Sequence, residues 1–111
     1  MIFIYKFDIL DILILQGEKR MISRSVTICN SVGLHARPAT FFVQKANCFK
    51  CSIWVEKEDC RVNAKSLLGV LSLGISNGTE ITLIADGADE GAAVEGLASL
   101  VESRFGEGQQ S

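Results

Sequence analysis

The stretch that decides the fold is Gly33-Leu34-His35-Ala36-Arg37-Pro38-Ala39, and it is followed by a run with helical periodicity. Pro38 is favoured in the first turn of a helix, where a missing backbone N–H costs nothing, so a helix is expected to begin within a residue or two of His35. Gly33 permits the preceding turn to adopt backbone angles that other residues resist. His35, the one histidine of the chain, then lies beside free N–H groups and the positive end of a helix dipole.

The same stretch combines three features that suit a phosphate group. A helix N-terminus binds anions through backbone N–H groups, which here begin at Ala36. Arg37 adds a fixed charge with a fork of donors that matches phosphate oxygens. A neutral nitrogen of the His35 imidazole can attack phosphorus, and both features would stabilise the product. A phosphate-carrying histidine is one interpretation, and a surface histidine at a helix cap is the other.

Two further stretches join this one in an order and at a spacing that resemble HPr, the histidine phosphocarrier family of the bacterial sugar phosphotransferase system. The similar segments are Gly33-Leu34-His35-Ala36-Arg37-Pro38-Ala39-Thr40 (active-site signature), Val62-Asn63-Ala64-Lys65-Ser66-Leu67-Leu68-Gly69-Val70 (regulatory-serine segment) and Gly87-Ala88-Asp89-Glu90 (start of the last helix). The resemblance covers about Met21 to Glu107. It implies a domain over 21–107, followed by a polar tail over 108–111.

The resemblance implies a role for each residue of the first stretch. Nδ1 of His35 would accept a phosphoryl group from the phosphoenolpyruvate-dependent Enzyme I and pass it to sugar-specific IIA domains. Arg37 and the backbone N–H of Ala36 would stabilise the phosphate. The sequence has no Gly-rich Walker loop for a nucleotide, so the chain is expected to be a stoichiometric carrier without a cofactor, and not an enzyme.

Ser66 precedes a short apolar run and is a preferred helix N-cap, which is one sufficient explanation of it. The resemblance implies a regulatory phosphorylation site instead, served by an HPr kinase/phosphorylase and read by a catabolite-control transcription regulator. A regulatory module that acts mainly through phospho-Ser66 in carbon catabolite control is the alternative function. The run holds more leucine than a short helix buries on one side. The resemblance implies an apolar docking patch with His35 at its rim, formed by Thr40, Leu67, Leu68 and Leu71.

The pattern of apolar residues predicts the order β-α-β-β-α-β-α and an α+β fold. Strands are expected over 23–29, 52–56, 60–63 and 80–85, and helices over 38–49, after Ser66 and over 89–104. The resemblance implies an open-faced β-sandwich, a four-stranded antiparallel sheet with three helices on one face. Trp54 would face outward from such a sheet, where a cross-strand packing pair is the preferred interpretation.

One position departs from the family pattern. Val32 stands where some family members have Ser or Asn, whose oxygen could bind phosphate or orient the loop. Ser31 and Asn30 are the candidates to supply that oxygen instead.

Charge is unevenly distributed along the chain. The net charge of −2 argues against direct nucleic-acid binding. Residues 80–107 hold seven acidic residues and one basic residue, Arg104. A basic front near His35 is expected from Arg24, Arg37, Lys45, Lys50 and Lys65. Such an arrangement suits docking to an acidic partner, although an ordinary solvated surface explains it equally well.

Residues 1–20 differ from the rest. Met1 to Leu15 is apolar but too short and too charged to span a bilayer, and it lacks the basic start of a signal peptide. Because the resemblance begins at Met21, which could itself start translation, the segment is expected to be an artefact of start-site choice. The alternative is a hydrophobic appendage that packs on the domain or mediates association. A cytoplasmic monomer without membrane insertion is expected.

The four cysteines are Cys29, Cys48, Cys51 and Cys60. Cys48-x-x-Cys51 has metal-ligand spacing, but a second such pair is lacking and the histidine has another use. No metal site is therefore expected, and reduced thiols fit a cytoplasmic protein. A small metal or redox domain is the third class of function, which zinc analysis would reveal.

Overall fold

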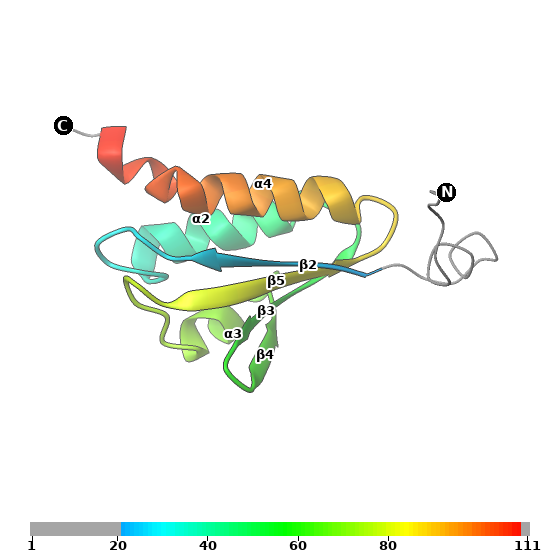
Figure 1. Cartoon of the computed structure of the whole chain (residues 1–111), viewed down its shortest axis with the longest axis horizontal. Coiled ribbons are helices and arrows are strands. Elements are labelled where there is room, and N and C mark those ends of the chain that lie inside the picture. The colour runs from blue at the N-terminus through cyan, green and yellow to red at the C-terminus, as the bar shows by residue number, and fades with distance from the viewer. Residues whose placement is uncertain (1–20, 110–111) are drawn as a thin grey trace, which may run out of the picture.

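The computed structural model describes residues 21–109, so the expectations for residues 1–20 and for the end of the polar tail lie outside the described residues. The elements are β2 (Ile22–Thr27), α2 (Ala36–Ala46), β3 (Ser52–Lys57), β4 (Cys60–Asn63), α3 (Leu67–Ser72), β5 (Glu80–Asp86), α4 (Glu90–Glu102) and a short 3-10 segment, η1 (Arg104–Gln109). Figure 1 shows their arrangement. The predicted order β-α-β-β-α-β-α and the α+β class are confirmed.

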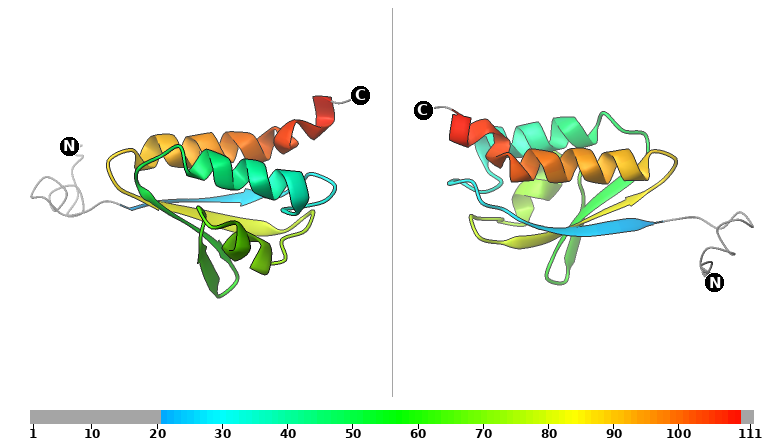
Figure 2. Two further views of the ribbon diagram at one scale, coloured as in Figure 1. Left: turned by 180° about the vertical axis from the view of Figure 1, so that it is seen from behind. Right: turned by 45° about the horizontal axis from the view of Figure 1, so that its top comes forward.

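The four strands form one antiparallel sheet in the order β2-β5-β3-β4. Helices α2 and α4 lie side by side over one face of the sheet, in Figure 1 and in both views of Figure 2. Helix α3 packs against α2 and β4. The arrangement is the open-faced sandwich that the resemblance implied, with the loop before α2 and the segment η1 at the same end of the molecule.

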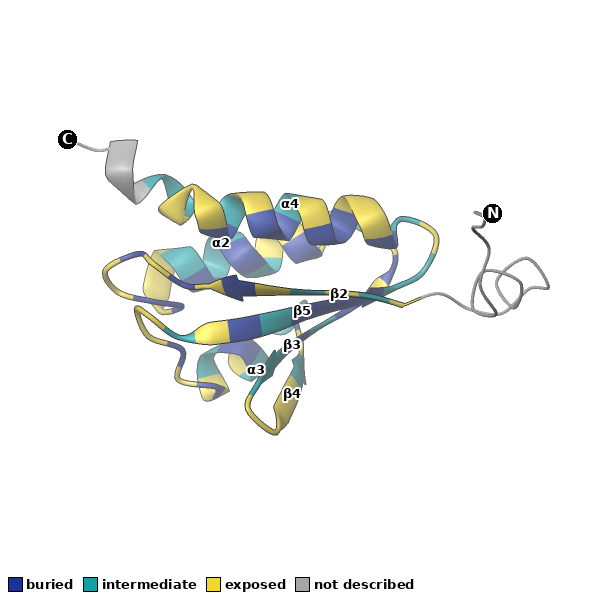
Figure 3. Cartoon of the chain, in the orientation of Figure 1, coloured by how far each residue is buried: buried dark blue, intermediate teal, exposed yellow. Residues whose placement is uncertain are grey.

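One hydrophobic core lies between the sheet and the helices. Alternate strand residues point into it, as the period of two along a strand requires. Figure 3 shows the buried stripes on both layers. The core members from the strands include Val26, Ile53, Val55, Ile81 and Leu83, and those from the helices include Phe42, Val70 and Leu97.

The opposite face of the sheet carries one apolar pair among polar side chains. Trp54 stands directly across from Ile84 in the register of β3 and β5, and Ile84 is only 5% exposed. Because directly opposed residues on one face pack against each other, this agrees with the predicted cross-strand pair.

Ion pairs join β2 to α4 and correct one expectation. The two Nη atoms of Arg24 lie 3.0 Å from Glu95 Oε2 and 3.0 Å from Glu102 Oε2. Arg24 was expected in a basic front near His35, and this was wrong. The alternation of β2 places Arg24 on the helix-covered face, where the carboxylates of α4 are its nearest partners.

Two helices end earlier than the sequence predicted. Helix α2 ends at Ala46 rather than residue 49, because the Asn47 side-chain amide donates to the carbonyls of Val43 (2.9 Å) and Lys65 (3.3 Å). Helix α4 ends at Glu102, because the backbone turns left-handed at Arg104 (φ 58°) and Phe105 (φ 55°). Within residues 21–109, none of the helices combines the length and the apolar character that crossing a bilayer demands.

Asp89 joins the start of α4 to the start of β3. It occupies the N-cap position of α4, and its carboxylate accepts the backbone N–H groups of Lys50 (2.8 Å) and Cys51 (2.9 Å). The N–H of Lys50 is the largest cause that lowers the pKa of Asp89 below its usual range, followed by the Cys51 thiol. The charged carboxylate is thus the form that the folded state favours.

We expect Asp89→Asn to lower the Tm at pH 7, because the two N–H groups bind different carboxylate oxygens and the NH2 group that replaces one of them cannot accept a hydrogen bond. A carboxyl whose folded-state pKa is depressed stabilises the fold above its unfolded pKa, about 4, and loses that effect as pH falls through the folded value. The Tm difference between wild type and Asp89→Asn should therefore shrink below about pH 4. Asp59→Asn, in the exposed β3–β4 turn, is the control. A difference that stays constant from pH 7 to pH 2.5 would contradict the assignment.

Candidate functional site

His35 occupies the N-cap of α2, as the position of Pro38 predicted. Its backbone is extended (φ −131°, ψ 157°), and its side chain makes no capping hydrogen bond. The residue is exposed. The imidazole is exposed and does not cap the helix, so it is available for chemistry beside the first N–H groups of α2.

Ala36, the first residue of α2, has a left-handed backbone (φ 53°). For an alanine this conformation costs roughly 1–2 kcal/mol, so the surrounding loop must impose it. The loop is held by two backbone hydrogen bonds, from Leu34 N–H to the Ile75 carbonyl (3.0 Å) and from Gly33 N–H to the Asn30 carbonyl (3.3 Å). Leu34 itself is fully buried, which fixes the chain immediately before His35.

Gly33 is required by space as well as by its conformation. Its φ is 68°, and a Cβ there would lie 2.4 Å from the Ile75 carbonyl oxygen and 2.6 Å from Ser76 Cα. The buried side chain of Asn30 donates from Nδ2 to the Gly33 carbonyl (2.9 Å). Asn30 therefore stabilises the loop from within, and Val32, which stands in the family's Ser or Asn position, is exposed.

Arg37 extends along the side of α2. Its guanidinium carbon lies 5.4 Å from the centre of the Phe41 ring, one turn further on, in a cation–π arrangement. Both residues line a hollow of about 300 Å³ together with Asn30, Pro38, Arg104, Phe105 and Gly106. Within the described part of the chain, Arg37 forms no ion pair.

Arg104 is the site residue that sequence reasoning missed. The left-handed turn after α4 brings it to the hollow of Arg37, and its Nε donates to the Cys29 carbonyl (3.3 Å) at the start of the loop. The one available signal was that Arg104 is the sole basic residue of the acidic 80–107 segment.

The other predicted basic residues lie elsewhere. Lys45 is in the last turn of α2, at the end opposite His35. Lys65 Nζ donates to the Phe49 carbonyl (2.6 Å), just beyond that end, and the Lys50 N–H is bound by Asp89. Of the five residues expected in a basic front, Arg37 alone accompanies His35, because Arg24 is on β2 and the three lysines lie at or beyond the C-terminal end of α2.

Ser66 is the N-cap of α3, and its Oγ accepts the N–H of Gly69 (3.1 Å). The bond from Asn47 to the Lys65 carbonyl places Ser66 beside the C-terminal end of α2, whereas the segment after α3 reaches the loop of His35 through Ile75. Ser66 and His35 therefore lie at opposite ends of the surface formed by α2 and α3.

The residues that were expected to form the docking patch differ in their exposure to solvent. Leu68 is 81% exposed and Leu67 is 41% exposed, whereas Leu71 packs against the core. Thr40 is partly exposed, and its Oγ1 donates to the Ala36 carbonyl (3.2 Å). Two adjacent exposed leucines on a short helix are unusual for a surface without a partner.

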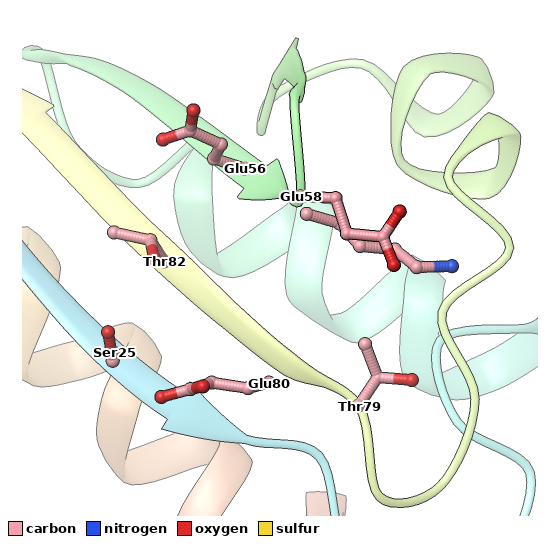
Figure 4. A pocket seen from close by; sticks show the side chains of 7 residues that line it. Ser25, Glu56, Glu58, Thr79, Glu80 and Thr82 are labelled. Atoms are coloured by element: carbon pink, nitrogen blue, oxygen red, sulfur yellow. The ribbon is translucent and has the colours of Figure 1, made fainter.

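A larger hollow, on the open face of the sheet, has the wrong charge for phosphate. Figure 4 shows its side chains, which include Glu56, Glu58 and Glu80. The one lysine that lines it, Lys57, donates from Nζ to the carbonyls of Leu73 (3.1 Å) and Gly74 (3.4 Å). The three carboxylates would repel an anion, and the ammonium of Lys57 is already bound to backbone carbonyls.

The cysteines do not come together. All four are free thiols: Cys51 is buried, and Cys29, Cys48 and Cys60 are exposed. Burial, followed by the hydrogen bond and charge of Asp89, raises the pKa of Cys51 to about 11. A thiol that stays protonated is a poor metal ligand. Among residues 21–109, no three side chains of the metal-binding types gather in one place.

The fold and the site define a small open-faced sandwich that presents one exposed histidine at a helix start. A family model described as the PTS HPr component phosphorylation site matches residues 22–103. The chain is 46% identical to the phosphocarrier protein HPr of Neisseria meningitidis serogroup A (80% of this chain, all of that one) and 49% identical to the HPr-like protein Crh of Bacillus subtilis (74% and 96%). The crystal structure of HPr-C-His from Thermoanaerobacter tengcongensis superposes with a TM-score of 0.77 at 50% identity, covering 78% of this chain and 97% of that one. The chain belongs to the HPr family.

Substitution of Gly33 tests how closely the loop approaches the segment after α3. Gly33→Ala should lower the free energy of unfolding by more than Gly74→Ala, because both positions have positive φ but an added Cβ meets nothing within 4 Å at Gly74. The strain alone costs about 1–2 kcal/mol, which Gly74→Ala measures, and the collision adds to it. Urea unfolding gives both values, and equal losses would show that the loop moves away without cost.

Proposed function

We propose that this chain is a cytoplasmic phosphocarrier that accepts a phosphoryl group on Nδ1 of His35 from Enzyme I and passes it to IIA domains of sugar permeases. The observation that carries the proposal is the exposed imidazole at the start of α2, which no capping bond occupies. Membership of the HPr family supports it. The chain acts stoichiometrically between enzymes and is not itself one.

The transfer needs few groups from this chain. The lone pair of the neutral imidazole nitrogen forms the N–P bond while the bond from phosphorus to the donor breaks, and its electron pair stays with the donor. Passing the group to an acceptor reverses these roles, and His35 becomes neutral again. Each step forms one bond to phosphorus and breaks another, so no oxidant, metal or nucleotide is required.

Arg37 and the backbone N–H of Ala36 stabilise the phosphorylated state in this proposal. A phosphoryl group on nitrogen carries a negative charge that backbone N–H groups at a helix start and a guanidinium both favour. Arg37 is well prepared for this, because the Phe41 ring supports its guanidinium and, within residues 21–109, no carboxylate neutralises it.

Docking of both partners would use the surface formed by α2 and α3, which has His35 at one end. In this proposal the exposed Leu67 and Leu68, with the partly exposed Thr40 and Leu71, supply the apolar contacts. Such a surface with Arg37 at its edge suits a partner whose apolar centre is rimmed by acidic residues. We propose a monomer as the working form, although two solved relatives, HPr from Thermoanaerobacter tengcongensis and Crh from Bacillus subtilis, are dimers.

The second candidate function is regulation through phosphorylation of Ser66. Its position supports this, because a phosphate at the N-cap of α3 meets favourable helix N–H groups and lies next to Leu67 and Leu68. The proposed enzyme is an HPr kinase/phosphorylase, and the proposed reader is a catabolite-control transcription regulator. The identity of 49% with Crh, the catabolite repression HPr of Bacillus subtilis, favours keeping this function beside the relay.

Incubation with phosphoenolpyruvate and Enzyme I should add one acid-labile phosphate to the wild-type chain. His35→Ala should abolish it without a loss of Tm, since the side chain is exposed and makes no capping bond. Intact mass before and after acid treatment measures the phosphate. Stoichiometric labelling of His35→Ala would overturn the assignment of the site.

Ser66→Asp should slow phosphorylation of His35 by Enzyme I, about threefold to tenfold at subsaturating concentration, because a negative charge beside the apolar patch opposes docking to an acidic partner. The Tm should stay close to that of wild type, since an aspartate is also a good N-cap. Ser99→Asp places the same charge on the exposed side of α4 and should leave the rate unchanged. Equal rates for Ser66→Asp and wild type would identify Ser66 as a helix cap alone.

A further inference from the structure

The turn after α4, formed by residues 104–106, brings the side chain of Arg104 to the hollow beside Arg37. Three consecutive residues, Arg104, Phe105 and Gly106, have left-handed backbones (φ 58°, 55° and 78°), and the first two are not glycine. Each non-glycine residue of this kind is unfavourable, so the tertiary contacts of the turn must compensate. Phe105 packs against the core, which holds the turn in place. Figures 1 and 2 show that this turn lies at the end of the molecule where α2 begins.

The guanidinium of Arg104 is only partly used. Its Nε donates to the Cys29 carbonyl, and this bond directs the side chain toward the loop of His35. The carboxylates of α4 do not compete for it, because Glu95 and Glu102 bind Arg24. A guanidinium has five N–H donors, so four of them remain on the Nη atoms. Among the side chains of residues 21–106, none forms an ion pair with Arg104.

Two guanidinium groups therefore line one hollow of about 300 Å³ with no carboxylate among its residues. Two like charges at one small site repel each other, and an anion between them removes the repulsion. A water takes about 30 Å³, so the hollow has room for a phosphoryl group and several waters.

A buried acceptor in the same hollow adds an independent observation. Asn30 is 1% exposed, and its Nδ2 is bound to the Gly33 carbonyl, which fixes the orientation of the amide. Its Oδ1 has no hydrogen-bond partner within the described residues. A buried acceptor without a donor is unfavourable, and the other side chains with hydrogen-bond donors that line the hollow are those of Arg37 and Arg104. The hollow is thus arranged to hold a guanidinium at its inner wall.

We infer that Arg104 is a second phosphate-binding residue of this site, whose Nη groups bind the phosphoryl group on His35 together with Arg37, while Asn30 Oδ1 accepts one guanidinium N–H. This inference rests on the proposed phosphorylation of His35. Arg37 connects the two parts, because it lies two residues after His35 and also lines the hollow of Arg104. Free phosphate would bind the same guanidinium groups as a phosphoryl group on His35, so the experiment must distinguish these two ligands.

The direct test follows arginine Nε–H signals of the ¹⁵N-labelled full chain by NMR. Phosphorylation with phosphoenolpyruvate and Enzyme I should shift the signals of Arg104 and Arg37 and leave that of Arg61, paired with Glu56 on the far hairpin, unchanged. Inorganic phosphate is titrated into a separate unphosphorylated sample. A response of Arg104 to free phosphate but not to phosphorylation of His35 would overturn the inference and identify an adventitious ion only.

The variant test measures the equilibrium of phosphoryl exchange with Enzyme I. Arg104→Gln should shift it toward the unphosphorylated chain by about threefold to tenfold, as expected for one lost charge-assisted contact at a partly exposed site. Arg104→Lys, which keeps the charge, should recover part of the shift, which a purely structural role would not produce. Arg61→Gln is the matched control.

The outcomes separate this inference from the proposed function. A wild-type chain that takes up phosphate normally, with an Arg104→Gln equilibrium equal to that of wild type and a stationary Arg104 signal, would overturn the role of Arg104 alone. A wild-type chain that takes up no phosphate would overturn both. Arg104→Gln could shift the equilibrium only because it lowers the Tm. In that case Arg104→Lys should lower the Tm as well and should not restore the equilibrium, which also counts against the inference.

Discussion

The hydrogen bond from Leu34 N–H to the Ile75 carbonyl, 3.0 Å long, is the constraint on which the site depends. It joins the loop before α2 to the segment after α3, and a Cβ on Gly33 would collide with the same carbonyl. With Leu34 fully buried, the chain has one way to enter α2, which explains how Ala36 is held in a left-handed conformation. His35 is thus held at the surface between the buried Leu34 and the left-handed Ala36.

The surface formed by α2 and α3 is held at both of its ends. At one end Asn47 binds the Lys65 carbonyl, and at the other Leu34 binds the Ile75 carbonyl. A phosphate on Ser66 would therefore act on a partner through the charge and hydration of the shared surface, and not by moving His35. The exposed Leu67 and Leu68 directly follow Ser66, so a phosphate there would change the charge and hydration next to both leucines.

Acidic and basic side chains occupy different parts of this acidic chain, and the proposed phosphate site contains basic ones. Arg24 pairs with Glu95 and Glu102 on α4, and the glutamates of the larger hollow lie on the open face of the sheet, away from the helices. Arg37 and Arg104 are left together at the start of α2. A net negative charge is thus compatible with an anion site, because local fields decide binding at distances shorter than the Debye length of about 8 Å.

The sequence by itself determined the element order, the position of His35 at the helix start and Ser66 as the cap of α3, because capping, proline geometry and apolar period act within a few residues. Three ordered motifs also determined the family. Tertiary structure alone decided that Arg24 pairs with glutamates of α4, that Asn47 ends α2 and that Arg104 lines the same hollow as Arg37. Each of these depends on partners 18 or more residues away or on left-handed backbones that local preference opposes, so only the packed core could select them.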